Sequence, residues 1–252
     1  MNEASFPAGS DGSMAAPTLE GVHAAPVSWL LALHSSAETL GIALQPLGET
    51  GPPRLESFPI GRALSNDLFR CVETVLPAEQ WPQLGRLAVA IGPGGFTGTR
   101  LTVTLARTLA QQLLLPLDGF GSFLLMARRR LGEPEPPADP FWLVQELPRR
   151  GLVAGLYAPD PQDPVGALEL IPPRLYREPA ALADAEARLA APASGEGVLR
   201  APAQRCPAQV QQPQDVAELL RCSQQAAAAG RPAPWQAVLP LYPTSPVDPV
   251  VP

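Results

Sequence analysis

LAVAIGPGGFTGTRLTVTLARTLAQQLLLPL, residues 87–117, predicts a buried strand, a glycine-rich loop and a helix in succession. The apolar run at 87–91 has the length of a buried strand, and Pro93, which has no amide hydrogen for a sheet ladder, marks its end. Four glycines in the loop allow tight or left-handed turns, and they leave room for another chain or a phosphate to approach closely. Thr97 is the expected N-cap of the following helix, whose N-terminus would attract anions.

The helix expected over residues 98–114 is apolar on two sides. Its only charged side chains are Arg100 and Arg107. One apolar stripe comprises Leu101, Leu105, Leu109 and Leu113, and the other comprises Val103, Ala106, Ala110 and Leu114. A helix with two apolar sides has two surfaces to bury. Its own sheet accounts for one surface, and the other predicts a protein partner.

The elements on either side of this unit indicate an α/β fold. The expected strands lie at 28–34, 40–44, 54–58 and 115–117, and the expected helices at 65–76 and 122–131. Ser65 is the expected cap of the first of these helices. A meander of strands followed by alternating strands and helices predicts a mixed sheet flanked by helices.

The segment GEPEPPADP, residues 132–140, interrupts this alternation and is the expected linker between two domains. Residues 27–131 would form the N-terminal domain, and residues 141–252 a smaller, degenerate α/β domain that ends in a proline-rich tail. The expected elements of the second domain are strands at 141–147 and 151–157 and helices at 180–190 and 215–229. Residues 1–26 lack the basic start and apolar core of a secretory signal, so we expect a disordered tail there.

The composition disfavours a protein that binds nucleic acid by itself. The 252 residues include 18 arginines, no lysine and 24 acidic residues, so the net charge is −6, whereas binding to DNA or RNA needs a basic surface. The one dense basic cluster, Arg128, Arg129 and Arg130, is expected to be a solvated helix end rather than a phosphate contact. Three widely spaced cysteines fit a reducing compartment, and no stretch approaches the roughly 18 apolar residues that span a bilayer. We therefore expect a soluble, cytoplasmic protein.

The glycine loop departs from the known phosphate-binding patterns. It lacks the G-x-x-x-x-G-K-[ST] spacing, and Thr97 stands where the third glycine of G-x-G-x-x-G would fall. Asp118 lies about 20 residues beyond Gly98, at the spacing of the carboxylate that binds a ribose in dinucleotide-binding folds. A dinucleotide-binding fold is therefore one alternative. A glycine-rich connector without a ligand is the other alternative. His34 is expected to be a structural residue at a strand end, and no pair of histidines is placed to bind a metal.

The sequence resembles the TsaB family, formerly called YeaZ, in two segments. The nonapeptide GPGGFTGTR, residues 92–100, is similar to the family motif GPGxFTGxR. The segment LLALHSSAETLGIAL, residues 30–44, is similar to the opening segment of the family. The resemblance covers residues 30 to about 127 and indicates a divergent, cyanobacterial-type member. It implies an actin-like ATPase, or RNase H-like, fold, in agreement with the order of elements deduced above.

The resemblance also implies a function. TsaB proteins are non-catalytic subunits of the bacterial machinery that makes threonylcarbamoyladenosine next to the anticodon of tRNA. They pair with a catalytic paralogue, TsaD, and with an ATPase, TsaE. The resemblance implies that the chain has no cofactor of its own and that the complex uses ATP and magnesium. It also implies that the chain contacts tRNA only as part of the complex. A homodimer is left open, and neither a membrane nor DNA is an expected partner.

Two sets of residues are the expected sites. The loop positions that would face a phosphate are Ser35, Ser36, Gly92, Pro93, Gly94, Gly95, Phe96, Thr97, Gly98 and Arg100. In the family two helices form the contact with TsaD, which here would place Leu68, Val72, Leu101, Val103, Leu105 and Ala110 at the interface. No residue is expected to be catalytic or to bind a metal.

The departures from the family pattern favour a scaffold or activator. His34 stands where actin-like ATPases have an aspartate that serves the metal and the nucleotide, and Gly95 replaces the serine of the motif. The closing PVYLR of the family is replaced by PLYPT at residues 240–244. The alternative is a stand-alone ATP-dependent enzyme that uses Ser35, Ser36 and the loop on phosphates, and a glycoprotease-like peptidase is a weaker one.

Overall fold

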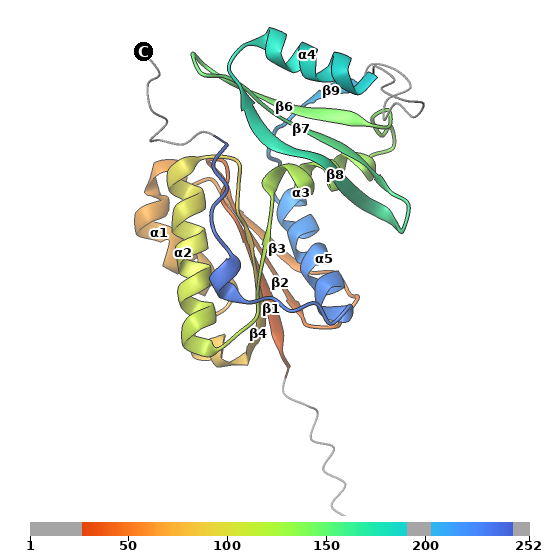
Figure 1. Cartoon of the computed structure of the whole chain (residues 1–252). Helices are drawn as coiled ribbons and strands as arrows, with labels where there is room; N and C mark the ends of the chain where they lie inside the picture. Colours follow the sequence, from red (N-terminus) through yellow and green to blue (C-terminus); the bar gives the residue numbers. More distant parts are fainter. Residues whose placement is uncertain (1–26, 191–202, 244–252) are drawn as a thin grey trace, which may run out of the picture.

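The computed structural model describes residues 27–190 and 203–243, which form a larger and a smaller α/β domain (Figure 1). The tails expected at residues 1–26 and beyond residue 243 lie outside the described residues. Within the described ranges, none of the helices is both long and apolar enough to span a bilayer.

The larger domain is built on a five-stranded mixed sheet with the strand order β3-β2-β1-β4-β5. Its strands are β1 (Trp29–His34), β2 (Leu40–Pro46), β3 (Arg54–Phe58), β4 (Leu84–Ala90) and β5 (Leu117–Phe120). The first three strands form the expected antiparallel meander, whereas β4 runs parallel to both β1 and β5. Both β1 and β4 are buried almost throughout, because helices cover both faces of the sheet.

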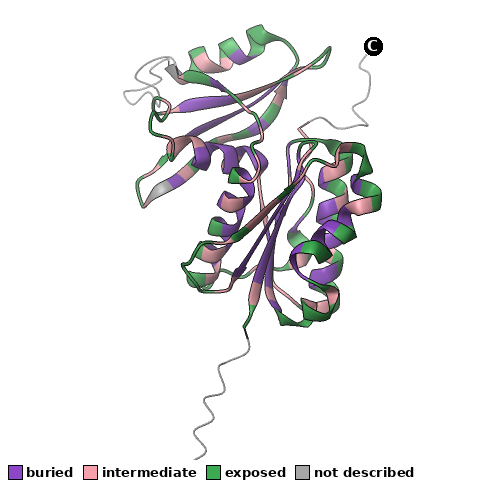
Figure 2. Cartoon of the chain, turned by 180° about the vertical axis from the view of Figure 1, so that it is seen from behind, coloured by how far each residue is buried: buried purple, intermediate pink, exposed green. Residues whose placement is uncertain are grey.

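Three helices form the outer layers of this domain. They are α1 (Leu64–Val75), α2 (Phe96–Leu113) and α5 (Gln214–Ala228). Leu31 and Leu33 of β1 point to the face covered by α1 and α2, and Leu30 and Ala32 point to the face covered by α5. Figure 2 shows the buried strands enclosed between these layers.

The smaller domain contains a four-stranded sheet with the order β8-β7-β6-β9. Its elements are β6 (Phe141–Leu147), β7 (Gly151–Asp160), β8 (Asp163–Tyr176), α4 (Pro179–Ala190) and β9 (Gln204–Pro207). Helix α4 covers one face of this sheet, and α3 (Ser122–Leu131) covers the other. The sequence did not indicate β8, which contains three prolines. It lies at the edge of the sheet, where a strand tolerates residues that cannot donate to a ladder.

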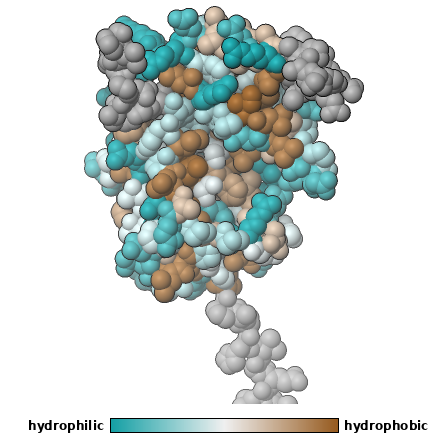
Figure 3. Space-filling model, viewed as in Figure 1, coloured by the Kyte–Doolittle hydropathy of each residue, from teal (hydrophilic) through white to brown (hydrophobic). Residues whose placement is uncertain are grey.

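The expected division into domains needs correction, because the chain returns to the larger domain after β9. Helix α5 packs on β1, β2 and β4 of the larger domain. The C-terminal segment, residues 230–243, then crosses this domain along α2 (Figure 1), and apolar side chains gather along its path in Figure 3. The backbone N–H of Leu241 donates to the Ile91 carbonyl at 2.7 Å, and Arg107 donates to the Val238 carbonyl at 2.6 Å. Residues 141–252 are therefore not one domain.

The ends of two helices also differ from expectation. Helix α2 begins at Phe96 with Gly95 as its N-cap, because the Gly95 carbonyl accepts the N–H of Thr99 at 3.0 Å. Thr97 lies inside the helix, and no side chain caps it. Ser65 likewise lies inside α1, whose N-cap is Ala63. The expectation that these two hydroxyls cap the helices is wrong.

The arginine cluster of α3 is buried, which corrects the expectation of a solvated helix end. Arg128 and Arg129 are 7% and 9% exposed, because α3 lies between α5 and the smaller sheet. Arg129 donates from Nε to Asp215 at 2.7 Å, and Arg128 donates to Asp163 at 3.1 Å and to Glu218 at 3.4 Å. These five residues, the arginine–carboxylate cluster, join α3 to α5 and to the smaller domain.

Replacement of Arg129 by methionine should strongly destabilise the protein. Arg129→Met leaves the fully buried Asp215 carboxylate without its guanidinium, so we expect the free energy of unfolding to fall by about 3 kcal/mol or more in denaturant titrations. The matched control is Arg130→Met, since Arg130 is 26% exposed and pairs with the half-buried Glu133. This change should cost less than about 1 kcal/mol. Equal losses in the two variants would contradict the assignment.

Replacement of Leu114 by glycine should stabilise the protein. Leu114 follows α2 with a φ of 56° and is 88% exposed, so it adopts a left-handed conformation without burying its side chain. Leu114→Gly removes the clash of the β-carbon, and we expect the free energy of unfolding to rise by about 1 kcal/mol. Leu114→Ala keeps the β-carbon and should leave stability unchanged. A gain of the same size in both variants would show that the apolar side chain, and not the backbone, is unfavourable.

Candidate functional site

The glycine loop packs directly against the turn that follows β1. The backbone N–H of Gly95 donates to the Ser36 carbonyl at 2.7 Å. A β-carbon on Gly94 would lie 2.4 Å from the Ser36 carbonyl oxygen, and one on Gly98 would lie 2.5 Å from that of Ser35. These positions therefore require glycine because another part of the same chain approaches them closely.

The two serines of this turn are already paired within the chain. The Ser35 hydroxyl lies 2.8 Å from that of Thr102, and the Ser36 hydroxyl lies 2.6 Å from that of Ser122; all four side chains are buried. The structure thus brings the turn and the loop together, as the resemblance implies. The two segments fill each other's space, however, so the residues present do not fit a phosphate between them.

The side chain of Asp118 points into the interior of the larger domain and does not face a ligand cleft. Its carboxylate receives two hydrogen bonds from Arg86, at 2.7 and 2.9 Å, and a third from Ser223. Both members of this ion pair are at least nine-tenths buried. The alternative in which Asp118 binds a ribose is therefore wrong. No group of three or more potential ligands for a metal ion occurs among the described residues.

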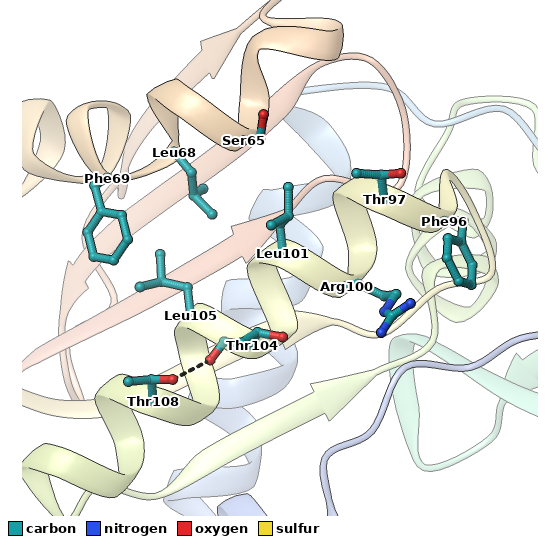
Figure 4. Close-up of a pocket in the computed structure, with 10 residues that line it drawn as sticks. All are labelled: Ser65, Leu68, Phe69, Phe96, Thr97, Arg100, Leu101, Thr104, Leu105 and Thr108. Carbon is teal, nitrogen blue, oxygen red and sulfur yellow. Dashed lines mark hydrogen bonds between the residues drawn. The ribbon is translucent and has the colours of Figure 1, made fainter.

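An apolar groove of about 490 Å³ lies between α1 and α2 (Figure 4). It is lined by Ser65, Leu68, Phe69, Phe96, Thr97, Arg100, Leu101, Thr104, Leu105 and Thr108. Leu68 and Leu105 form a buried floor, toward which Leu101 also points. Phe69 and Phe96, which are 56% and 43% exposed, stand at opposite ends of the groove. Large apolar side chains exposed next to an apolar floor are typical of a surface that binds another protein.

The comparisons with known proteins agree with this architecture. No protein-family model matches the sequence. One hundred residues are 36% identical to "tRNA threonylcarbamoyladenosine biosynthesis protein TsaB" of Bacillus subtilis, and they cover 39% of this chain and 43% of that protein. YeaZ from Pseudomonas aeruginosa matches the structure with a TM-score of 0.62 over 85% of this chain and 99% of its own, at 20% identity. The chain is thus similar to TsaB in part of its sequence and to YeaZ in its fold.

A second solved structure, from an uncharacterized protein with similarity to peptidase YEAZ from Pseudomonas aeruginosa, matches with a TM-score of 0.63. That match covers 86% of this chain and all of the other, again at 20% identity. The expected α/β fold, with a mixed sheet flanked by helices, is thereby confirmed. The sequence match spans less than half the length of the Bacillus TsaB.

The groove contains only half of the residues expected at a partner interface. Leu68, Leu101 and Leu105 line it. Val72, Val103 and Ala110 are at most 1% exposed and pack in the core beneath the two helices, so the expectation that they contact a partner is wrong. The two apolar stripes of α2 did not reveal which one faces the sheet.

Sequence reasoning missed the aromatic residues of the groove. Phe69 lies among the polar residues of α1, and an aromatic side chain on such a face is the signal that could have identified it. Phe96 was assigned to the loop, although it is the first residue of α2. Arg100, expected to face a phosphate, instead lines the groove beside Phe96, with its Cζ 5.0 Å from the centre of the Phe96 ring.

His34 occupies the end of β1 as a fully buried, neutral side chain. Its Nδ1 accepts a long hydrogen bond of 3.5 Å from the Ser36 N–H, and its Nε2 has no partner among the described residues. Desolvation lowers the pKa of His34 from 6.5 to about 4. The imidazole is therefore uncharged at neutral pH.

Buried His34 should make the protein less stable in mild acid. Because its pKa is lower in the folded than in the unfolded state, the unfolded chain takes up the proton first, and stability falls as the pH drops from 6.5 towards 4. Between pH 7.5 and 5.0 this group should remove about 2 kcal/mol, measured by denaturant titration at each pH. His34→Gln lacks the titrating group and should lose correspondingly less over the same interval. Identical losses in the two proteins would show that His34 is not desolvated.

Proposed function

We propose that this chain is a non-catalytic scaffold or activator subunit of the machinery that makes threonylcarbamoyladenosine in tRNA. It acts in the cytoplasm by forming a heterodimer with TsaD. The sequence similarity to the Bacillus protein supports the process, since that relative is named for the biosynthesis of threonylcarbamoyladenosine. The α1–α2 groove supports the mode of action, because it is a surface suited to another helix and not to a small polar substrate.

The groove is the observation that carries this proposal. Its floor is apolar, and the exposed rings of Phe69 and Phe96 offer the large apolar contacts that contribute most to protein association. Two neighbouring helices present a furrow into which the side-chain ridge of a third helix can pack. A paralogue with the same fold would present equivalent helices, which gives a pseudo-symmetric pair.

The neighbourhood of the glycine loop supports a non-catalytic role. The serine hydroxyls are paired within the chain and His34 is neutral, so this region holds no group prepared for phosphate chemistry. In the proposal, the complex uses ATP and magnesium, and TsaE is its ATPase. The chain contacts tRNA only as part of the complex. No observation on the described residues favours the ATP-dependent or the peptidase alternative.

Replacement of Phe69 by glutamate should abolish the heterodimer and leave the fold intact. The ring is 56% exposed, so the monomer loses little, whereas an unpaired carboxylate buried against the apolar partner is strongly unfavourable. We expect at least a 100-fold weaker binding of TsaD by calorimetry, and loss of tRNA modification in the reconstituted system.

The control for this experiment is Leu170→Glu, since Leu170 is a half-exposed leucine of β8 in the smaller domain. It introduces the same charge far from the groove and should leave TsaD binding unchanged. If both variants melt like the wild type and Phe69→Glu still binds TsaD normally, the groove is not the interface. If Phe69→Glu instead abolishes self-association of the chain alone, the groove serves a homodimer.

A further inference from the structure

Arg100 is the only charged residue that lines the α1–α2 groove. The other lining residues are apolar or carry hydroxyl groups, and no carboxylate is among them. Within the described part of the chain, the Arg100 guanidinium has no ion pair and no hydrogen bond. The carboxylate of Asp67, on α1, does not line the groove and is paired with Arg70 at 3.0 Å. The groove thus presents one uncompensated positive charge in a chain whose net charge is −6.

The position of this guanidinium is already restricted before a partner binds. Its Cζ lies 5.0 Å from the centre of the Phe96 ring, within the range of a cation–π contact. Figure 4 shows both side chains at the same end of the groove. A side chain held in place loses less conformational entropy when it forms an intermolecular contact. Arg100 is therefore prepared for a contact at the rim of the groove.

A helix docked in the groove would remove Arg100 from water. Burial of a guanidinium without a counter-charge is strongly unfavourable, and none of the described residues that line the groove carries a carboxylate. A second copy of the chain would present the same groove, again without a carboxylate. The occupant that satisfies this surface is a different protein whose docking helix carries an aspartate or a glutamate.

We propose that Arg100 pairs with a carboxylate on the interface helix of TsaD and thereby fixes how the two proteins align. This inference rests on the proposed function. Guanidinium and carboxylate form two parallel hydrogen bonds, which set both the position and the orientation of the partner. The apolar floor supplies the contact area, and Arg100 selects the partner that brings the complementary charge.

The test compares TsaD binding by the wild type, Arg100→Met and Arg100→Glu in calorimetry at low and at high salt. Loss of the pair in Arg100→Met should weaken binding about 10-fold, and repulsion in Arg100→Glu about 100-fold or more. Binding by the wild type should weaken with added salt more steeply than binding by Arg100→Met. The control is Arg188→Glu, an equal charge reversal at an exposed position of α4, which should stay within about twofold of the wild type.

Charge reversal in the partner completes the experiment. Each acidic residue of the TsaD interface helices is changed to arginine, and one of these variants should bind Arg100→Glu better than it binds the wild type. Binding of Arg100→Glu within twofold of the wild type, or equal salt dependence of wild type and Arg100→Met, would overturn the pairing. If Phe69→Glu still abolished binding in that case, the proposed function would stand. Absence of binding between wild type and TsaD would overturn both.

Discussion

The close contact between the glycine loop and the turn after β1 is the constraint on which the larger domain depends. It fixes where α2 begins, because Gly95, which binds the Ser36 carbonyl, is also the N-cap of that helix. The direction of α2 in turn determines the groove that it forms with α1 and the side along which the C-terminal segment runs. The glycines of this motif are here explained by packing of the chain against itself. The same glycines place Phe96 and Arg100 at the rim of the groove.

The arginine–carboxylate cluster has a comparable role between the domains. Helix α3 is shared, since its apolar side chains pack on the smaller sheet while Arg128 and Arg129 bind α5. Ion pairs buried in this way add little net stability compared with apolar packing, but they are costly to break. Because their hydrogen bonds are directional, these ion pairs fix the position of α5 against α3.

The periodic parts of the fold could be predicted from the sequence, and the contacts between distant segments could not. The bounds expected for α3, β3 and β6 agree with the structure, because apolar spacing and turn residues are local signals. Strand β8 escaped prediction because its prolines are acceptable only at the edge of a sheet. The burial of Arg129 depends on Asp215, 86 residues away, and no local pattern indicates it. For the same reason the two apolar stripes of α2 suggested a partner face but did not distinguish Leu101 from Val103.

The return of the chain to its first domain has a consequence for synthesis. The face of the central sheet that carries Leu30 and Ala32 is covered mainly by α5, and the carbonyl of Ile91 accepts the N–H of Leu241. During translation the sheet is complete long before these elements leave the ribosome. Its second face then stays open to solvent, and non-local contacts of this kind form late. The two halves of the larger domain are therefore one folding unit, although the whole smaller domain lies between them in the chain.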